Sequence, residues 1–364
     1  MKIKNVINFL ESNAPIVYQE DYDNSGLIVG DVNDIITNVL ITLDCTDEVV
    51  DEAVEKKCNL IISHHPLIFS GIKSITGKNY IERTIIKAIK NNISIYAIHT
   101  NLDNVKHGVN SIIADRIGLI NQKVLEPKIG VMRKLVVYCP NNYLSKVSKS
   151  LFKAGAGSIG NYSECSFVSE GKGTFKPSDN AQPFIGKKNE NTVLTENKIE
   201  VVFPFHKQNE IIKEMIRSHP YEEISYQIFN ILNHNNNIGS GIIGDLKKPS
   251  SSIDFLNKIK IKMKTSCIKY TKLVKKNVKT IAVCGGSGSH LLSTAISRHA
   301  DLYISSDFKY HDFFNAEKNI IIADIGHYES EQFTKELIFD MLTNNFTKFG
   351  ILLSKINTNP IKYL

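Results

Sequence analysis

The sequence predicts an α/β protein in which two α/β halves form one core, with a smaller α+β domain inserted between them. Residues 1–127 alternate short apolar runs with amphipathic segments, which is the rhythm of βαβ units around a mostly parallel sheet. The same rhythm returns in residues 237–364. Residues 128–236 differ, because their strands and helices flank a glycine-rich stretch in the order of a ferredoxin-like domain.

The N-terminal half begins with an amphipathic helix and then alternates strands with helices. Thr46 or Asp47 is a suitable N-cap for the second helix, and Gly118 ends the last one. The expected helices are 6–12, 49–54, 81–90 and 112–117, and the expected strands are 38–43, 60–63 and 93–98.

The inserted domain and the C-terminal half follow with their own elements. The glycine-rich stretch between Gly155 and Gly186 is expected to be loops. In the insertion we expect strands at 131–139 and 199–205 and helices at 143–154 and 207–218. In the C-terminal half we expect strands at 279–284, 302–305 and 319–325, a turn at 285–289 and a helix at 291–298.

The composition indicates which partners and which cellular compartment to expect. The net charge of +7 comes from lysines spread along the chain, and the basic stretch Lys264–Lys279 has no interleaved aromatic residues. This pattern favours a solvated surface over nucleic-acid binding. No run approaches the roughly 18 apolar residues of a membrane span. Six widely spaced cysteines predict reduced thiols, and therefore a cytoplasmic protein.

Four apolar runs lead into residue types that can bind metals, and one of them, 302–305, is followed by Asp307 and His311. His64 and His65 follow one predicted strand, and His99 follows the next, while His327 follows a strand near the C-terminus. Because the carboxyl ends of such strands meet at one edge of a sheet, these side chains are expected to share a metal site. Neighbouring histidines at a strand end reach two separate ions more easily than one.

The candidate ligands contain nitrogen and oxygen but no sulfur, which suits Zn²⁺, Mn²⁺ or Fe²⁺. Two spacings of four residues, from His99 to Asp103 and from His327 to Glu331, place a histidine and a carboxylate close together. The set exceeds what a closed tetrahedral site needs, so it favours an open centre with two ions. Its members are His64, His65, Asp103, His327 and Glu331.

Other polar residues near these strand ends have more than one possible role. His99 could orient a ligand, act as a general acid or base, or be a hydrogen-bonded core residue. Asp44 and Thr46 could contact a water at the site, although capping the next helix is the expected job. The run Gly285–Ser289 could cradle a phosphate or form a tight turn.

Several segments, in their order along the chain, resemble the Nif-three-like dinuclear metal centre proteins, a family known as GTP cyclohydrolase 1 type 2 homologs. The insertion is similar to the middle domain of the longer bacterial members. The segments of the core are Asp23–Leu27, Ser63–Pro66, His99–Asp103, Gly285–Ser289 and Asp324–Glu331, and those of the insertion are Ala154–Tyr162 and His219–Glu223. One difference is Ser306 before Asp307, where the family usually has glycine; serine fits there only with a negative φ.

The resemblance implies two metal ions on the five ligands given above, in a homohexameric ring with the sites facing an internal cavity. It also implies a hydrolase with a nucleotide-like substrate, specifically one that opens the imidazole ring of GTP and releases formate and dihydroneopterin triphosphate. Water activated by the metals would attack C8 of the purine, and His99 or Glu331 would move the proton. Lys309 and His311, with the Gly285–Ser289 run, would hold the phosphates.

Two other functions stay open at this point. A phosphoesterase would use the same pair of ions for a different reaction. A non-catalytic regulatory scaffold would use the metals for stability and the insertion for ligand or partner contacts, although fold alone says little about function.

Overall fold

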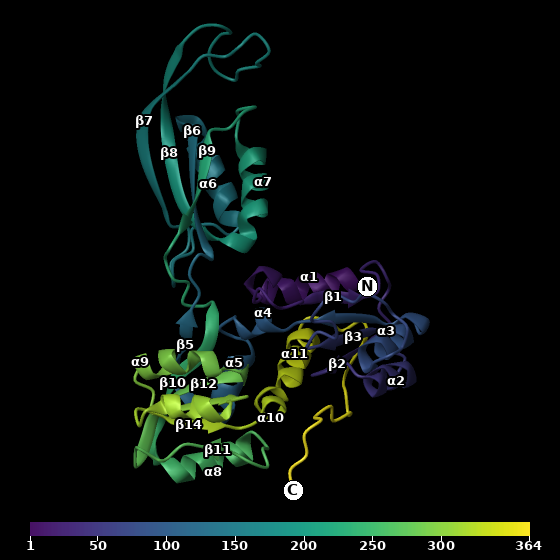
Figure 1. Ribbon diagram of the computed structural model, residues 1–364. Helices are drawn as coiled ribbons and strands as arrows, with labels where there is room; N and C mark the ends of the chain where they lie inside the picture. The colour runs from purple at the N-terminus through teal and green to yellow at the C-terminus, as the bar shows by residue number, and fades with distance from the viewer. The chain divides into compact units, whose positions relative to one another are not determined.

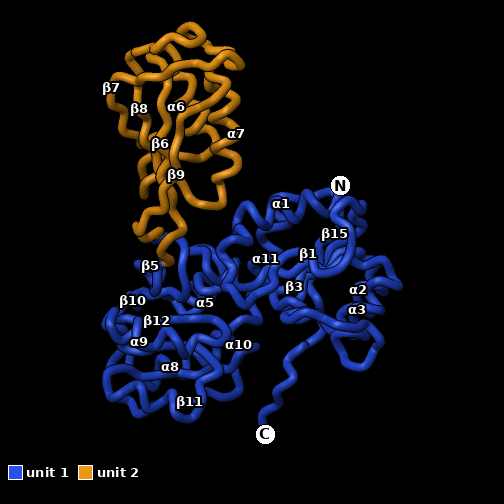
Figure 2. Tube along the Cα trace, turned by 45° about the horizontal axis from the view of Figure 1, so that its top comes forward, with its two compact units in different colours: residues 1–127, 236–364 blue, residues 128–235 orange.

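The computed structural model describes residues 1–364, and its contacts divide the chain into two units. Unit 1 joins residues 1–127 to residues 236–364, and unit 2 comprises residues 128–235 (Figure 2). The α/β class predicted from the sequence is confirmed, since unit 1 contains two mixed sheets flanked by helices.

The first sheet of unit 1 has five strands in the order β1-β4-β3-β2-β15. All its pairings are parallel except that of β1 with β4, as the βαβ pattern predicts. Its strands are β1 (Gly26–Val29), β2 (Asn38–Thr42), β3 (Leu60–Ser63), β4 (Ser94–Ala97) and β15 (Gly350–Leu353).

Alternating side chains of this sheet enter two different cores. Val39 and Ile41 of β2 pack with helices on one face, whereas Leu40 between them packs on the other. The helices of the first face are α1 (Ile3–Asn13) and α11 (Thr334–Thr343), and those of the second are α2 (Asp47–Glu55) and α3 (Tyr80–Lys90).

The second sheet has six strands in the order β11-β14-β13-β12-β10-β5. The pairings of β12 with β13 and of β13 with β14 are parallel, and the other three are antiparallel. Its strands are β5 (Leu119–Pro127), β10 (Gly239–Ser251), β11 (Lys269–Tyr270), β12 (Asn277–Ser287), β13 (Leu302–Ser306) and β14 (Ile321–Asp324), and its helices are α5 (Val109–Ile117), α8 (Ser252–Lys262) and α9 (Leu292–Ser297).

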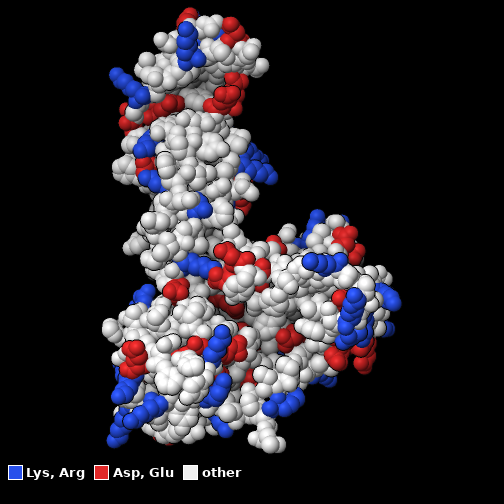
Figure 3. Space-filling model, in the orientation of Figure 1, with Lys and Arg blue, Asp and Glu red and all other residues white.

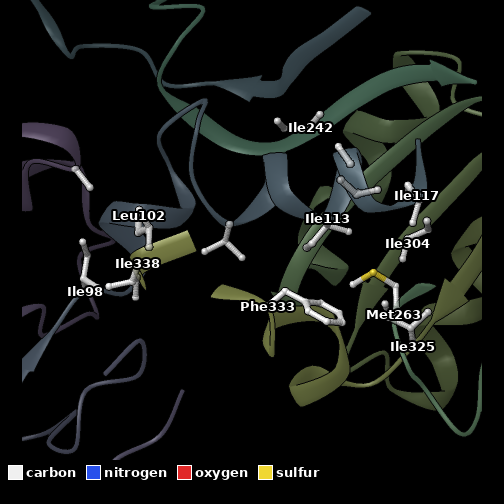
Figure 4. Packing of buried hydrophobic residues seen from close by; sticks show 14 of the residues in the cluster. Ile98, Leu102, Ile113, Ile117, Ile242, Met263, Ile304, Ile325, Phe333 and Ile338 are labelled. Atoms are coloured by element: carbon white, nitrogen blue, oxygen red, sulfur yellow. The ribbon is translucent and has the colours of Figure 1, made fainter. Parts of the chain in front are cut away.

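The two halves of the sequence exchange elements, which ties the sheets together. The N-terminal half supplies β5 to the second sheet, and the C-terminal half supplies β15 to the first. Figure 1 shows α11 between the two sheets. One apolar cluster runs from Leu102 and Ile338 to Ile113 and Ile304 (Figure 4). Unit 1 is therefore held by a core that neither half could complete alone.

Unit 2 is a four-stranded antiparallel sheet with two helices and its own apolar core. The strand order β7-β8-β6-β9 and the chain order βαββαβ are those of the ferredoxin-like fold that the sequence predicts. Its elements are β6 (Met132–Pro140), α6 (Leu144–Lys153), β7 (Ser166–Phe175), β8 (Thr192–Pro204), α7 (Gln208–Ser218) and β9 (Tyr226–Ile231).

Two local predictions from the sequence are wrong. The stretch Gly155–Gly186 was expected to be loops, but it contains β7, an edge strand whose residues are mostly exposed and so lack an apolar alternation. The run Gly285–Ser289 was expected to be a turn, yet Gly285 to Ser287 continue β12. Both segments contain glycines, which have no side chain and so contribute nothing to the alternation of apolar and polar residues by which a strand is predicted.

None of the helices combines the length and the apolar character that are needed to cross a bilayer. On the face of unit 1 shown in Figure 3, acidic side chains gather in the middle, and many of the Lys and Arg side chains lie toward the outer edges.

The shared core of unit 1 makes a prediction about stability. Ile113 is 1% exposed, and its truncation in Ile113→Ala leaves a cavity where helix α5 meets the second sheet. We expect a loss of about 2–5 kcal/mol in the free energy of unfolding, measured by urea denaturation. Ile120→Ala is the matched control, because Ile120 is 45% exposed and its loss should cost under about 0.5 kcal/mol. Equal midpoints for the two variants would contradict this account of the core.

Candidate metal centre

The histidines and carboxylates predicted from the sequence lie together at the carboxyl ends of strands from both sheets. His64 and His65 follow β3, and Asp103 ends the short helix α4 (Thr100–Asp103), which follows β4. His327 and Glu331 begin and end α10 (His327–Glu331), which follows β14. This is the edge at which open α/β sheets bind their ligands.

Three groups of side chains could hold a metal ion, because within each group the ligand atoms lie within 4.8 Å of one another. Glu331 belongs to two of these groups, and so do His64 and His65. The groups are His64, His65 and His99; His65, His327 and Glu331; and His64, Asp103 and Glu331.

Each of the four histidines is held through its Nδ1 atom by an oxygen. Such a bond fixes the orientation of the ring and leaves Nε2 as the nitrogen that can bind a ligand. The pairs are His64 with Ile98 O at 2.8 Å, His65 with Asp44 Oδ1 at 2.7 Å, His99 with Asp23 Oδ1 at 2.8 Å, and His327 with Asp307 Oδ2 at 2.6 Å.

Two buried polar atoms of the cluster have no hydrogen-bond partner, namely Nε2 of His64 and Oδ1 of Asp103. They lie 3.6 Å apart, and the His64 side chain is fully buried. Because the Nδ1–H of His64 donates to Ile98, a neutral ring presents its lone pair at Nε2. An unsatisfied buried group costs about 1–3 kcal/mol, and a metal ion bound between these two atoms would remove that cost. The donor set therefore fits a metal ion.

Glu331 lies at the centre of the cluster and is 2% exposed. Its Oε2 is 2.9 Å from Nε2 of His65 and 3.1 Å from Nε2 of His327, while its Oε1 is 3.9 Å from Nε2 of His64. The two oxygens of one carboxylate thus face different histidines. This arrangement allows Glu331 to serve two groups of ligands at once.

The close packing of histidines and carboxylates shifts the pKa values of several residues in the cluster. Burial alone would lower the pKa of His65, but hydrogen bonds to Asp44 and Glu331 raise it to about 10. Burial alone would raise the pKa of Glu331, but His327 and the other histidines hold it well below its usual range. Burial raises the pKa of Asp103 to about 6, despite attraction to His64. Protons on His65 and His327, whose pKa values are both raised, therefore offset the buried carboxylates, a role that a cation would take over.

Sequence reasoning missed how Asp44 and Thr46 are used. Asp44 orients His65, and its other oxygen accepts a hydrogen bond of 2.5 Å from Thr358 in the C-terminal tail. Thr46 is the N-cap residue of α2, as the sequence predicts, but its side chain makes no capping hydrogen bond. No sequence pattern could predict the contact of Thr358 with Asp44, because the two residues are far apart in the sequence and meet only in the folded chain.

The glycine run makes room for the cluster. Gly286 has φ of 61°, and a Cβ atom there would overlap Oε1 of Glu331. Ser306, for which the sequence predicts a negative φ, lies in β13 with no positive φ, and its hydroxyl donates to Gly286 O at 2.5 Å. The left-handed residue is instead Asp307, with φ of 59°, which holds His327.

A cavity of about 740 Å³ opens onto the cluster. Five of the site residues predicted from the sequence line it, namely His65, His99, Asp103, His327 and Glu331. Lys309 and His311, which the sequence suggested as phosphate contacts, do not line it.

The fold and the cluster together define an α/β protein with a candidate metal centre and an inserted ferredoxin-like domain. The model of the Duf34/NIF3 (NGG1p interacting factor 3) family matches residues 1–360, and the chain belongs to this family. The resemblance seen in the sequence is thereby confirmed.

The chain matches relatives of similar length over nearly their whole sequences. The chain is 38% identical to a "GTP cyclohydrolase 1 type 2 homolog" of Bacillus subtilis, over 99% of this chain and 98% of that protein. It is 36% identical to a protein of the same name from Staphylococcus epidermidis, over the full length of both. The crystal structure of a Bacillus cereus protein related to NIF3 superposes with a TM-score of 0.87 at 34% identity, covering 100% of this chain and 99% of that one.

The space beside Glu331 gives a direct test of the cluster. Gly286→Ala adds a Cβ atom against Oε1 of Glu331 in a left-handed backbone conformation, so the carboxylate must move. We expect the affinity for Zn²⁺ to fall at least about tenfold, measured by competition with a chromogenic chelator.

The matched control is Gly71→Ala, since no heavy atom lies within 4 Å of a Cβ atom at that position. This variant should bind Zn²⁺ as the wild type does. Unchanged affinity in Gly286→Ala would mean that Glu331 is not a ligand.

Proposed function

We propose that the cluster is a centre for two divalent metal ions and that the protein is a hydrolase of a nucleotide-like small molecule. The observation that carries the proposal is the position of Glu331, whose Oε2 faces His65 and His327 while its Oε1 faces His64. His64, Asp103 and Glu331 would hold one ion, and His65, His327 and Glu331 would hold the other.

Chemistry of the donors and the surroundings supports this assignment. Imidazole nitrogens and carboxylate oxygens without sulfur suit Zn²⁺, Mn²⁺ or Fe²⁺. A pair of such ions acts as a Lewis acid and makes water acidic enough to be a nucleophile near neutral pH. The cavity leaves space beside the cluster for a substrate, as an open catalytic centre requires.

His99 is the residue that we assign to proton transfer. It lines the cavity, and its Nδ1 is fixed by Asp23, a carboxylate whose own pKa lies well below its usual range: burial alone would raise it, but the contact with His99 outweighs burial. Asp23 would stabilise the imidazolium that forms when His99 takes up a proton. Glu331 would act as a shared ligand, because both of its oxygens are needed by the two groups.

The specific reaction that we propose is the opening of the GTP imidazole ring with release of formate. Its support is the name of the relatives and the presence of a histidine suited to general acid–base work beside the cluster. Phosphoester hydrolysis would use the same ions, and release of phosphate instead of formate would identify it. The hexameric ring and the cytoplasmic location stay predictions.

Formate release tests the proposed reaction. The purified protein, loaded with Zn²⁺ or Mn²⁺ and checked for metal content, is incubated with GTP, and formate is measured with formate dehydrogenase. We expect formate from the wild type and none above background from His64→Ala, which lacks a buried ligand. Absence of formate from the wild type at full metal content would contradict GTP ring opening.

His99→Ala separates proton transfer from metal binding. We expect this variant to keep its metal content, because the two proposed groups of ligands do not include His99. Its turnover should fall by roughly 10²–10⁴-fold, the usual contribution of a general acid or base. If the metal is lost instead, His99 is a ligand, in line with the group that it forms with His64 and His65.

A further inference from the structure

The walls of the cavity over the cluster contain no lysine and no arginine. Four carboxylates line it, and they belong to Glu20, Asp44, Asp103 and Glu331. Proteins that bind the phosphates of nucleotides supply lysine, arginine or the amides of a helix N-terminus. The cavity offers none of these cationic side chains, and Thr46, the N-cap residue of α2, is among its lining residues.

The net charge of a filled site is also low. On the proposed function, the four positive charges of two divalent ions match the four negative charges of these carboxylates. A site without net charge attracts a triphosphate little from a distance, and the triphosphate must lose the water around its several negative charges on entry. A phosphate could contact an ion directly, but only at the position that the proposed reaction needs for water. An uncharged molecule loses much less hydration.

Aromatic side chains in the cavity wall favour a planar, uncharged ligand. Tyr22, Phe69 and Tyr80 line the cavity, and the ring of Phe69 meets the ring of His99 edge-on with 5.6 Å between their centroids. Such rings offer faces on which a planar heterocycle can stack. Oγ1 of Thr46, a buried atom without a hydrogen-bond partner, also belongs to a lining residue and can bond to a polar edge of that heterocycle.

We propose that the cavity recognises the uncharged ring of a nucleoside- or nucleobase-like substrate, and that phosphates add nothing to binding. The inference rests on the proposed function and narrows its substrate class. GTP would then be bound through its guanine, and guanosine would bind as well as GTP.

The test compares guanosine with GTP, two ligands that differ only in the triphosphate. Binding to the full-length, metal-loaded protein is measured by isothermal titration calorimetry at low and at high salt, with adenosine as a second uncharged ring. We expect guanosine to bind within about threefold of GTP or more tightly, with little effect of salt on either. GTP binding that is at least about 100-fold tighter and weakens with salt would overturn the inference, and so would failure of both nucleosides to bind.

Formate measured in the same samples separates this inference from the proposed reaction. Binding of guanosine without any formate would remove GTP ring opening and leave ring recognition standing. Formate from GTP together with strong preference for the triphosphate would do the reverse.

A pair of variants tests whether the ligand stacks on the side chain of Phe69. Phe69→Ala should weaken guanosine and GTP equally, by about tenfold, because a stacking surface is lost. The matched control is Phe314→Ala, since Phe314 is 64% exposed and does not line the cavity. Equal affinities of both variants for guanosine would overturn stacking on Phe69.

Discussion

The structure of the site depends on one constraint, the anchoring of each histidine through its Nδ1 atom. Ile98 holds His64 through a backbone carbonyl, while carboxylates hold the other three rings. Without these bonds an imidazole could rotate and present either nitrogen. With them, Nε2 of each ring is the atom left to bind a ligand, and Glu331 lies where His64, His65 and His327 approach one another.

Each anchor comes from the same half of the sequence as its histidine, but the cluster itself is assembled from both halves. Glu331 stands in α10, yet the histidine nearest to it is His65, which follows β3 in the other half. One apolar cluster joins Leu102 and Ile338 to Ile113 and Ile304, and it fixes the strand ends of the two sheets relative to one another. Packing energy thus offsets the cost of gathering buried carboxylates and histidines at one point.

The sequence alone predicted the α/β class and the residues that the structure brings into the cluster. It succeeded because strand ends are visible as apolar runs followed by His and Asp or Glu, as at His64 and His99. It failed where side chains carry no pattern: β7 is mostly exposed, and the glycines of 285–286 continue β12. The contact of Thr358 with Asp44 spans 314 positions, and no local pattern reports such a distance.

The central claim is that Glu331 is shared by two ions. Its most direct test is the metal content of Glu331→Gln, measured by inductively coupled plasma mass spectrometry after saturation with Zn²⁺ and desalting. The control is Glu336→Gln, because Glu336 pairs with Arg116 away from the cluster. The account predicts two ions per chain in the wild type and the control, and the loss of both in Glu331→Gln. Two ions retained by Glu331→Gln, or no ion in the wild type, would contradict it.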